Sequence, residues 1–548
     1  MKKTVCLLLV FIFALSVLSA CGGEPDVTTA PADTQTVGTQ TTERITEAAV
    51  TGAKTEPETE PGTEPVTEQQ TEPEETIPEF VVVEDEEATL TLPKTFGSHM
   101  VLQRDADIRV FGKSNRDGSV IRGTFKDQTV YTVVKDGKFT LKFAPEPASA
   151  EQAELLVEDD KGNSVKFEDV LVGDVWLISG QSNANISLEE IRTGLTKLPE
   201  FNGDDPMRIF MQRPDYYLAD PKIAHEPCDD FLDPAVKWKK PDYLSSLKFS
   251  ALGLFFGRRL MSDLGIPIGV INIAANGARI QELMTKEAAK SVRLTTSYTM
   301  KPGDFFNTMV NPLIGISFKG MVFFQGEGEA GATNTAKNYA TYLKAYVEDM
   351  KKQFGFDFAF YEVQLSSYSD KSLPNFKYVN YVRFGQYQGM VDMGSENILP
   401  SYDLRSPDKY FDYMHSPKKE QLANRIADLV LAKEYGIGDK NDYLAPAPAE
   451  ITLSEDKKTV TVKFVNVCEG LVSKSGNASV NGFYIGTENK MSAAEAEIIS
   501  SDTVLVHVPE GVNTKKIAYA LETVINEENT QLYNSKDMPA LAFWQDLT

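Results

Sequence analysis

The segment Val172–Asn185 constrains this chain most, because it joins a buried strand to a sharp polar turn. Its apolar run Val175–Ile178 is typical of a strand inside a sheet. The turn Gly180–Asn183 follows, and open α/β sheets form their ligand crevice at the carboxyl ends of such strands. Ser182 is therefore a candidate for chemistry, while a simple helix cap is the alternative interpretation of a serine in this turn.

Buried strands and amphipathic helices alternate from Leu171 to about Tyr435. Further apolar runs suit parallel strands at residues 269–273, 321–324 and 358–361. Apolar residues recur at helical spacing within residues 252–264, 339–354 and 422–430. Ser416-Pro417 predicts the N-cap and the first residue of the last helix. The alternation predicts an α/β domain at residues 171–440, with a doubly wound parallel sheet and helices on both faces.

Short alternating strands are predicted on both sides of this α/β region. Residues 138–143 alternate polar and apolar side chains after Asp136-Gly137, which is typical of a hairpin. Strand patterns return after the proline-containing segment 445–448. We therefore expect two β-sandwich-like domains, an N-terminal one at residues 88–170 and a C-terminal one at residues 446–548.

The first 87 residues differ in composition from the rest of the chain. Residues 1–20 carry two lysines and then an apolar run, which is typical of a secretory signal peptide. Residues 21–87 repeat Thr-Glu-Pro and hold 18 acidic residues against two basic ones, so they contribute most of the net charge of −24. Such a segment has too little apolar surface to offset the entropy lost on ordering, which predicts a disordered acidic stalk.

The sequence Leu18-Ser19-Ala20-Cys21 resembles a bacterial lipobox. This resemblance implies a lipid on Cys21, so we expect a secreted lipoprotein anchored at the extracellular face of a bacterial membrane. An ordinary signal peptide with an incidental cysteine is the alternative. Cys228 and Cys468 match no metal or redox spacing, and no basic segment predicts nucleic-acid binding.

An activated serine needs a base, and the sequence offers four histidines. His99 and His507 lie in the predicted β domains, and His225 lies in a polar loop. His415 follows Asp412 by three residues near the end of the α/β region. On one turn of chain the carboxylate can reach the Nδ1 atom of the imidazole while the Nε2 atom faces the serine.

Two more predicted strands end in groups that suit an oxyanion. Asn276-Gly277 follows the strand at residues 269–273, and a glycine lets a backbone N–H approach a ligand closely. Gln325 follows the strand at residues 321–324, and its amide can donate a hydrogen bond. Each group alone also suits an ordinary turn, but their occurrence after successive strands favours a catalytic site.

Residues 90–547 resemble the sialate O-acetylesterase-type carbohydrate esterases of the SGNH (GDSL-like) hydrolase superfamily. The similarity begins at Gly173-Asp174 in this region, and the motif from Val175 to Asn183 is highly specific. Further shared segments lie at residues 100–104, 249–251, 267–271, 325–327, 363–365, 482–483 and 532–534. The resemblance implies an SGNH-type fold and a serine esterase that removes acetyl groups from sialic acid or from acetylated polysaccharides.

The resemblance also implies roles for individual residues. Ser182 would be the nucleophile and His415 the base, with Asp412 orienting the imidazole and Asp403 as the alternative orienting group. The oxyanion would bind the N–H groups of Ser182 and Gly277 and the side chain of Gln325.

Four more residues would support the site or bind substrate: Gln181, Asn183, Asn276 and Glu327. The resemblance implies neither a metal nor an organic cofactor. The expected partner is an O-acetylated sugar or glycan.

The chain departs from the family pattern around the pocket. Asn276 stands where the family usually has glycine, and Gly328-Glu329 replaces Ser-Asn. Tyr413-Met414 precedes the histidine, and Phe543-Trp544 replaces Pro-Phe-Arg near the end. These departures leave the identity of the sugar open.

Two alternatives remain. A peptidase or lipase of the α/β-hydrolase fold would need a glycine where Ala184 stands in the nucleophile motif. A non-catalytic, glycan-binding surface lipoprotein would have a degenerate esterase pocket.

Overall fold

A computed structural model of this chain describes residues 78–191, 204–213, 223–295, 300–368, 377–405, 415–526 and 528–547. These residues all fall in the unit Glu75–Thr548. The predicted signal peptide, Cys21 and the predicted stalk up to residue 77 lie outside the described residues.

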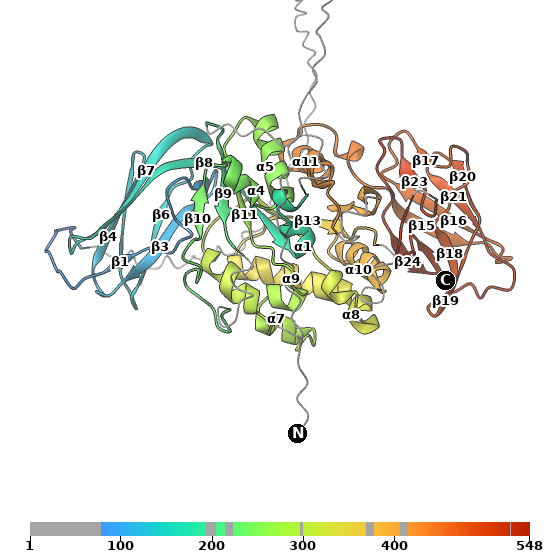
Figure 1. Ribbon diagram of the computed structural model, residues 1–548, viewed down its shortest axis with the longest axis horizontal. Coiled ribbons are helices and arrows are strands. Elements are labelled where there is room, and N and C mark those ends of the chain that lie inside the picture. The colour runs from blue at the N-terminus through green and yellow to red at the C-terminus, as the bar shows by residue number, and fades with distance from the viewer. Residues whose placement is uncertain are drawn as a thin grey trace, which may run out of the picture. The chain divides into compact units, whose positions relative to one another are not determined.

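The central sheet has the order β10-β9-β11-β8-β12-β13-β14 (Figure 1). Its strands are β8 (Ser164–Gly180), β9 (Met207–Met211), β10 (Lys237–Lys239), β11 (Ile268–Asn272), β12 (Gly320–Phe324), β13 (Ala359–Gln364) and β14 (Ile398–Pro400). All neighbours pair in parallel except β10, which is antiparallel at one edge. Because β8 is central in this order, the chain that leaves its carboxyl end emerges in the middle of the sheet.

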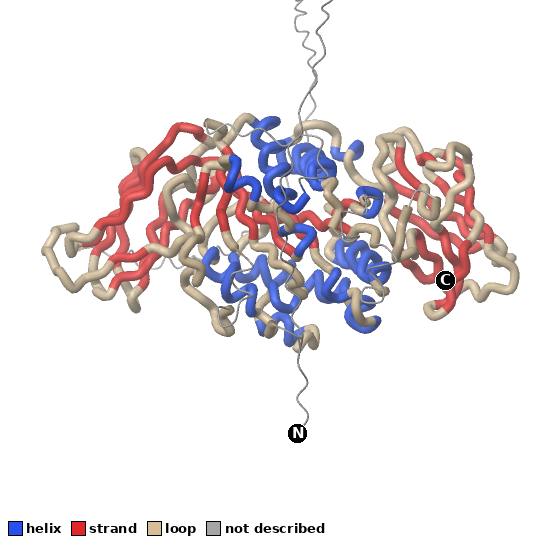
Figure 2. The backbone as a smooth tube through the Cα atoms, in the orientation of Figure 1, coloured by secondary structure: helices blue, strands red, loops and turns tan. Residues whose placement is uncertain are grey.

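Helices cover both faces of this sheet, as Figures 1 and 2 show. Helix α5 (Ala251–Leu264) packs against α11 (Lys419–Tyr435), and α9 (Tyr339–Phe354) packs against α10 (Val379–Asp392). The shorter helices are α1 (Ser182–Asn185), α2 (Leu188–Ile191), α4 (Tyr243–Leu247), α6 (Ile280–Leu283), α7 (Lys286–Ser291) and α8 (Thr333–Lys337). The predicted fold class, a mixed α/β domain with β-rich flanks, is confirmed.

Helix α11 begins later than the sequence predicted. Ser416-Pro417 was expected to provide its N-cap and first residue, but the helix begins at Lys419 after Lys418. The Ser416 hydroxyl instead donates to the carbonyl of Leu404 and accepts from the N–H of Lys418 at 3.2 Å. The serine therefore anchors the approach to the helix to the short 3₁₀ helix Tyr402–Leu404.

The N-terminal β region forms two sheets (Figure 1). One contains β1 (Leu90–Thr91), β3 (Ile108–Ser114) and β6 (Lys138–Phe143). The other contains β4 (Val120–Phe125), β5 (Gln128–Val133), β7 (Ser149–Asp159) and the first half of β8, which β2 (Val101–Gln103) joins in parallel. The boundary predicted at residue 170 therefore falls inside one continuous strand.

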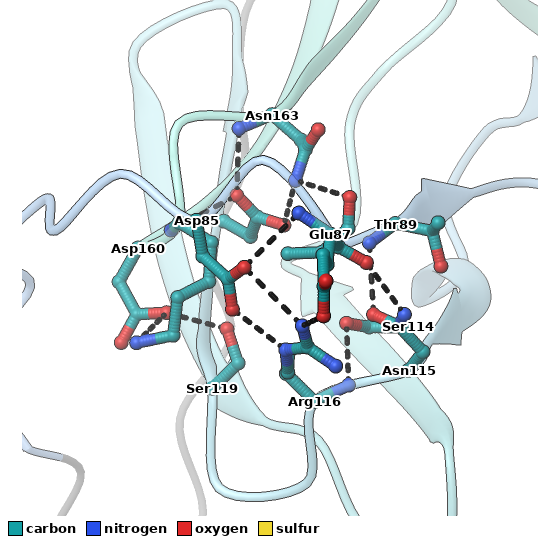
Figure 3. Close-up of polar contacts among 12 residues, drawn as sticks. Asp85, Glu87, Thr89, Ser114, Asn115, Arg116, Ser119, Asp160 and Asn163 are labelled. Carbon is teal, nitrogen blue, oxygen red and sulfur yellow. Dashed lines mark hydrogen bonds and ion pairs between the residues drawn. The ribbon is translucent and has the colours of Figure 1, made fainter.

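Residues 78–87, the end of the segment predicted as a stalk, lie within the described residues. The N–H groups of Val83 and Asp85 donate to the carbonyls of Asp160 and Lys161, at 2.8 and 3.1 Å. The Arg116 guanidinium donates to both oxygens of Asp85, at 2.7 and 3.2 Å (Figure 3). The last residues of the predicted stalk are thus bonded to the β region.

The C-terminal region is composed of antiparallel strands. One sheet contains β15 (Ala447–Leu453), β16 (Thr459–Val465), β21 (Thr503–His507) and β20 (Ala496–Ser500). A second contains β19 (Lys490–Ala493), β18 (Phe483–Thr487), β22 (Lys516–Tyr519) and β24 (Phe543–Asp546), and β17 (Leu471–Ser473) pairs with β23 (Leu532–Asn534). The Gln364 side chain bonds the backbone of Ala542 in both directions, which ties this region to β13.

Asp174 in β8 joins three parts of the fold beneath the sheet. Its Oδ1 atom accepts from Gln103 Nε2 at 2.8 Å and from Arg104 Nε at 3.0 Å, and its Oδ2 atom accepts from the Tyr435 hydroxyl at 2.9 Å. The Asp174 side chain is 1% exposed, so these partners replace water almost completely. The shared segment at residues 100–104 thus has a structural role at the end of the sheet opposite Ser182.

Replacing Asp174 by alanine should lower the free energy of unfolding by about 3–5 kcal/mol, because buried donors lose their acceptor. Denaturant unfolding of the purified protein measures this loss. The control is Asp263→Ala on α5, where a surface ion pair with Arg259 is removed and less than about 1 kcal/mol should be lost. Equal losses in the two variants would contradict the role of Asp174.

Candidate active site

Ser182 lies where β8 turns sharply into the short helix α1. Gly180 has a φ of +127°, and a Cβ at this position would lie 2.1 Å from the carbonyl oxygen of Phe324 in β12. Only glycine fits such a close approach of two backbones. The chain therefore leaves the sheet immediately, and Ser182 becomes the first residue of α1.

The structure brings Ser182 and His415 together across 233 positions of sequence. The Ser182 Oγ atom lies 2.8 Å from His415 Nε2, and both residues are half-buried. This separation is a hydrogen bond, in the range where a serine hydroxyl can pass its proton to an imidazole. The two residues come from the carboxyl end of β8 and from the approach to α11.

The group that orients His415 was predicted to be Asp412, with Asp403 as the alternative. Asp412 lies outside the described residues. Both carboxylate oxygens of Asp403 accept from Arg425 of α11, at 2.9 and 2.7 Å. This bidentate ion pair engages both oxygens of Asp403 and ties the 3₁₀ helix Tyr402–Leu404 to α11.

Gln181 precedes the serine and points into the protein. Its Oε1 atom accepts from the N–H groups of Gly326 and Gly328, at 3.3 and 3.1 Å, and from Gln325 Nε2 at 3.1 Å. The side chain is buried, so of the predicted roles, supporting the site fits Gln181 better than binding substrate. It fixes the turn after β8 to the turn after β12.

The sequence predicted that the Gln325 amide donates to an oxyanion. In the structure this amide is instead engaged by protein acceptors. The Gln325 side chain is 0% exposed, and its Nε2 atom lies within hydrogen-bond distance of Gln181 Oε1, the Ala278 carbonyl and Glu329 Oε2. An amide nitrogen carries two hydrogens, so these acceptors use its whole donor capacity. Gln325 is a buried support of the site.

The turn at Asn276-Gly277 is bound directly to α1. Asn185 donates to Asn276 Oδ1 at 3.0 Å and accepts from Asn272 at 2.7 Å. Gly277 is exposed with a φ of +72°. Among the contacts that the structure describes, the N–H groups of Gly277 and Ser182 donate to no protein acceptor. Both therefore remain available to an anionic ligand.

Asn183 links two buried ionisable residues, Glu327 and Lys419. Its Nδ2 atom donates to Glu327 Oε1 at 2.6 Å, and its Oδ1 atom accepts from Lys419 Nζ at 2.7 Å. Burial raises the pKa of Glu327 and lowers the pKa of Lys419 to about 7. Asn183 and Glu327 are both buried, so they support the site from below.

Two further buried carboxyl groups lie in the same polar layer. Glu329 accepts from the N–H of Ile280 at 3.1 Å and from Gln325 at 2.6 Å, and burial raises its pKa to about 7. Glu362 in β13 accepts from Gln386 at 2.6 Å, and burial raises its pKa well above the usual range. Uncharged carboxyl groups are favoured in such surroundings.

Sequence reasoning missed Lys419 and Glu362. The sequence contained a signal for each residue. Lys419 is in helical phase with the apolar residues Leu422 and Ile426, and Glu362 interrupts an apolar strand. A charged residue inside an otherwise apolar pattern indicates a buried polar contact. It does not say which partner the fold supplies.

The other histidines lie in separate contacts. His99 bonds Asp169 at 2.6 Å, His225 bonds Asp304 at 2.9 Å, and His507 lies on β21 near Glu497. Cys228 and Cys468 are free thiols. No cluster of three or more His, Cys, Asp or Glu side chains within the described ranges is arranged to hold a metal ion.

The raised pKa of Glu329 predicts a pH-dependent difference in stability. A carboxyl group whose pKa rises from 4.5 to about 7 on folding stabilises the protein least above pH 7, because the folded state then buries a charge. Between about pH 5 and about pH 8, wild type should therefore lose about 2–3 kcal/mol relative to Glu329→Gln. Denaturant unfolding at several pH values measures this difference.

The matched control is Glu348→Gln, because Glu348 is an exposed residue on α9. That variant should follow wild type at every pH. If the curves of wild type and Glu329→Gln ran parallel, Glu329 would not be the buried titrating group.

Residues 172–432 match the sequence model of a family described as "Carbohydrate esterase, sialic acid-specific acetylesterase". Human sialate O-acetylesterase is 27% identical over 329 residues, which cover 55% of this chain and 61% of the human protein. The mouse protein of the same name is 23% identical over 419 residues, covering 65% of this chain and 75% of the mouse protein. The chain thus spans about three fifths of the human relative.

The crystal structure of a carbohydrate acetylesterase from Xanthomonas citri has a similar fold. It superposes with a TM-score of 0.71 at 22% identity and covers 84% of this chain and all of that chain. The region that matches the family model, residues 172–432, contains the second half of β8, the Ser182 turn, His415 and most of α11. Residues 172–432 of this chain are therefore similar to the sialic acid-specific acetylesterase family of carbohydrate esterases.

Proposed function

We propose that this protein is a serine esterase that removes O-acetyl groups from carbohydrates through an acyl-enzyme intermediate. The observation that carries the proposal is the 2.8 Å contact between Ser182 Oγ and His415 Nε2. It lies inside the region that matches the sequence model of a carbohydrate esterase family. A nucleophile and a base at this distance supply the two groups that ester hydrolysis needs first.

In the first half-reaction, the Ser182 oxygen attacks the acetyl carbonyl carbon while His415 Nε2 accepts the hydroxyl proton. Collapse of the tetrahedral intermediate breaks the bond to the sugar oxygen, which leaves with the proton from His415. In the second half-reaction, His415 activates water, which attacks the acetyl-Ser182 ester. Acetate leaves and the serine regains its proton.

The negative charge of each intermediate is assigned to the N–H groups of Ser182 and Gly277. Neither N–H group donates to a protein acceptor among the described residues. An N–H group without a protein acceptor can donate to the oxygen that becomes negative during the reaction. Gln325 supports this arrangement from below, because its own amide is engaged by protein acceptors.

The sugar is proposed to be O-acetylated sialic acid, with acetylated polysaccharides as the other class. The family description and the names of the human and mouse relatives favour sialic acid. The departures from the family pattern at Asn276 and Glu329 occur at the site itself. The two classes of substrate are therefore compared directly in the experiment below.

The protein is further proposed to act outside a bacterial cell, anchored by a lipid on Cys21. The sequence supports this through the lipobox-like Leu18–Cys21 and the acidic segment that follows it. In the described part of the chain, none of the helices combines the length and apolarity that crossing a bilayer requires.

Replacing Ser182 or His415 by alanine should lower kcat/KM for a chromogenic acetate ester by about 10³-fold or more, because each removes one member of a unit that acts together. Released acetate is measured in parallel on an O-acetylated sialoside and on acetylated xylan. The substrate with the higher kcat/KM identifies the sugar class.

The matched controls are Ser291→Ala on α7 and His507→Ala on β21, which lie outside the proposed site and should retain wild-type rates. Full activity in Ser182→Ala would remove the esterase assignment. A folded wild type without turnover on any of the three esters would favour a non-catalytic glycan-binding protein.

Replacing Cys21 by serine should release the protein from the membrane fraction of an expressing bacterium, since the thioether requires the cysteine sulfur. Metabolic labelling with an alkyne fatty acid and membrane fractionation measure both consequences. Cys228→Ser is the matched control and should remain labelled and membrane-bound. Labelling of Cys21→Ser at the wild-type level would contradict the anchor.

A further inference from the structure

The chain at the start of α11 contacts the serine turn at two points. One is the contact of His415 with Ser182, and the other is formed by the helix itself. Lys419 is the first residue of the helix, four positions after His415. Its Nζ atom donates to Asn183 Oδ1 at 2.7 Å, and Asn183 directly follows Ser182. The segment that carries the imidazole and the turn that carries the hydroxyl are thus joined twice.

The surroundings of Lys419 are almost free of water. The side chain is 1% exposed, and its ammonium group lies 5.2 Å from the centre of the Phe324 ring. Glu327 acts electrostatically on the Lys419 amine. Both side chains form hydrogen bonds with the side chain of Asn183. Glu327 is itself 2% exposed, and its Oε2 atom has no hydrogen-bond partner within the described residues.

A simple stabilising role explains this arrangement poorly. Lys419 occupies a position in phase with Leu422 and Ile426, where a leucine would pack without the cost of removing an ammonium group from water. Burial opposes the charged forms of both Lys419 and Glu327, as the shifts of their pKa values show. A costly polar bridge beside a reacting pair is typical of residues that fix its geometry.

We propose that Lys419 is a positioning residue: through Asn183 and Glu327 it holds the Ser182 turn at the start of α11, so that the Ser182 hydroxyl stays within hydrogen-bond distance of His415. This inference rests on the proposed esterase function. Lys419 itself touches neither the substrate nor a reacting atom. Its effect passes through the side chain of Asn183, so substitutions of Lys419 and Asn183 should not have independent effects on kcat.

The test begins with Lys419→Met, which retains an unbranched side chain and removes the donor. If Ser182 and His415 are displaced in this variant, kcat for the acetate ester should fall by about 10- to 100-fold, because small displacements of reacting groups lower reaction rates by such factors. KM should stay within about twofold of wild type. The rate at which a fluorophosphonate labels Ser182 should fall by a similar factor.

A double-mutant cycle separates positioning from general stability. If Lys419 acts through Asn183, then Asn183→Ala should lower kcat to a similar level, and adding Lys419→Met should change it by less than about twofold further. A loss of stability alone would lower the melting temperature and leave kcat of the folded enzyme unchanged. Independent, multiplicative losses in kcat would also overturn the proposal.

The matched control is Lys433→Met, which removes a lysine from the same helix where it forms a surface ion pair with Glu396. It should keep the wild-type kcat. If Lys419→Met does not fold, Asn183→Ala alone must still lower kcat at least about 10-fold, and a wild-type value overturns the inference.

The outcomes also distinguish the two proposals. A wild type that does not cleave acetate esters, or a fully active Ser182→Ala, overturns the esterase function and this inference with it. An active wild type together with a folded and equally active Lys419→Met overturns the inference alone.

Discussion

The close passage of Gly180 beside β12 decides how the turn after β8 presents its side chains. A Cβ there would lie 2.1 Å from the Phe324 carbonyl oxygen, so the chain must turn at a glycine and cannot continue along the sheet. The next three residues then reach different partners. Gln181 bonds the turn after β12, Ser182 meets His415, and Asn183 bonds Glu327 and Lys419. The geometry of the site therefore depends on contacts from β12 and α11 as much as on β8.

The layer beneath the serine is polar, which is uncommon for the centre of an α/β sheet. The glutamates at 327, 329 and 362 are nearly or fully buried, and burial raises the pKa of each. Each has a side-chain amide partner, from Asn183, Gln325 and Gln386 respectively. Amides have fixed donor and acceptor ends, so such a network restricts the turn to few arrangements. An apolar layer of the same volume would pack equally well and would leave the turn freer to shift.

Much of the fold was predictable because the elements of the α/β region carry strong local patterns. The apolar runs that became β11, β12 and β13 were found, while the boundary expected at residue 170 was wrong because β8 serves two sheets. Composition cannot reveal a strand shared in this way. The pairing of Ser182 with His415 was also foreseeable, since few histidines were available. Lys419 was missed because a lysine at the start of a helix is usually solvated, and only the fold supplies Asn183 as its partner.

The Gln325 amide, predicted as an oxyanion donor, is engaged by protein acceptors, and one of these acceptors is a departure already visible in the sequence. Glu329, noted in the sequence as a departure from the family pattern, accepts from the Gln325 amide at 2.6 Å, and Gln181 and Ala278 are further acceptors of the same amide. In the proposed mechanism, the oxyanion then relies on two backbone N–H groups. The hydrogen bond from Asn185 of α1 to Asn276 joins the two turns that carry these groups. Asn276 is the other departure from the family pattern noted in the sequence, and each of the two residues forms a hydrogen bond within the site: Glu329 engages the Gln325 amide, and Asn276 joins the Gly277 turn to α1.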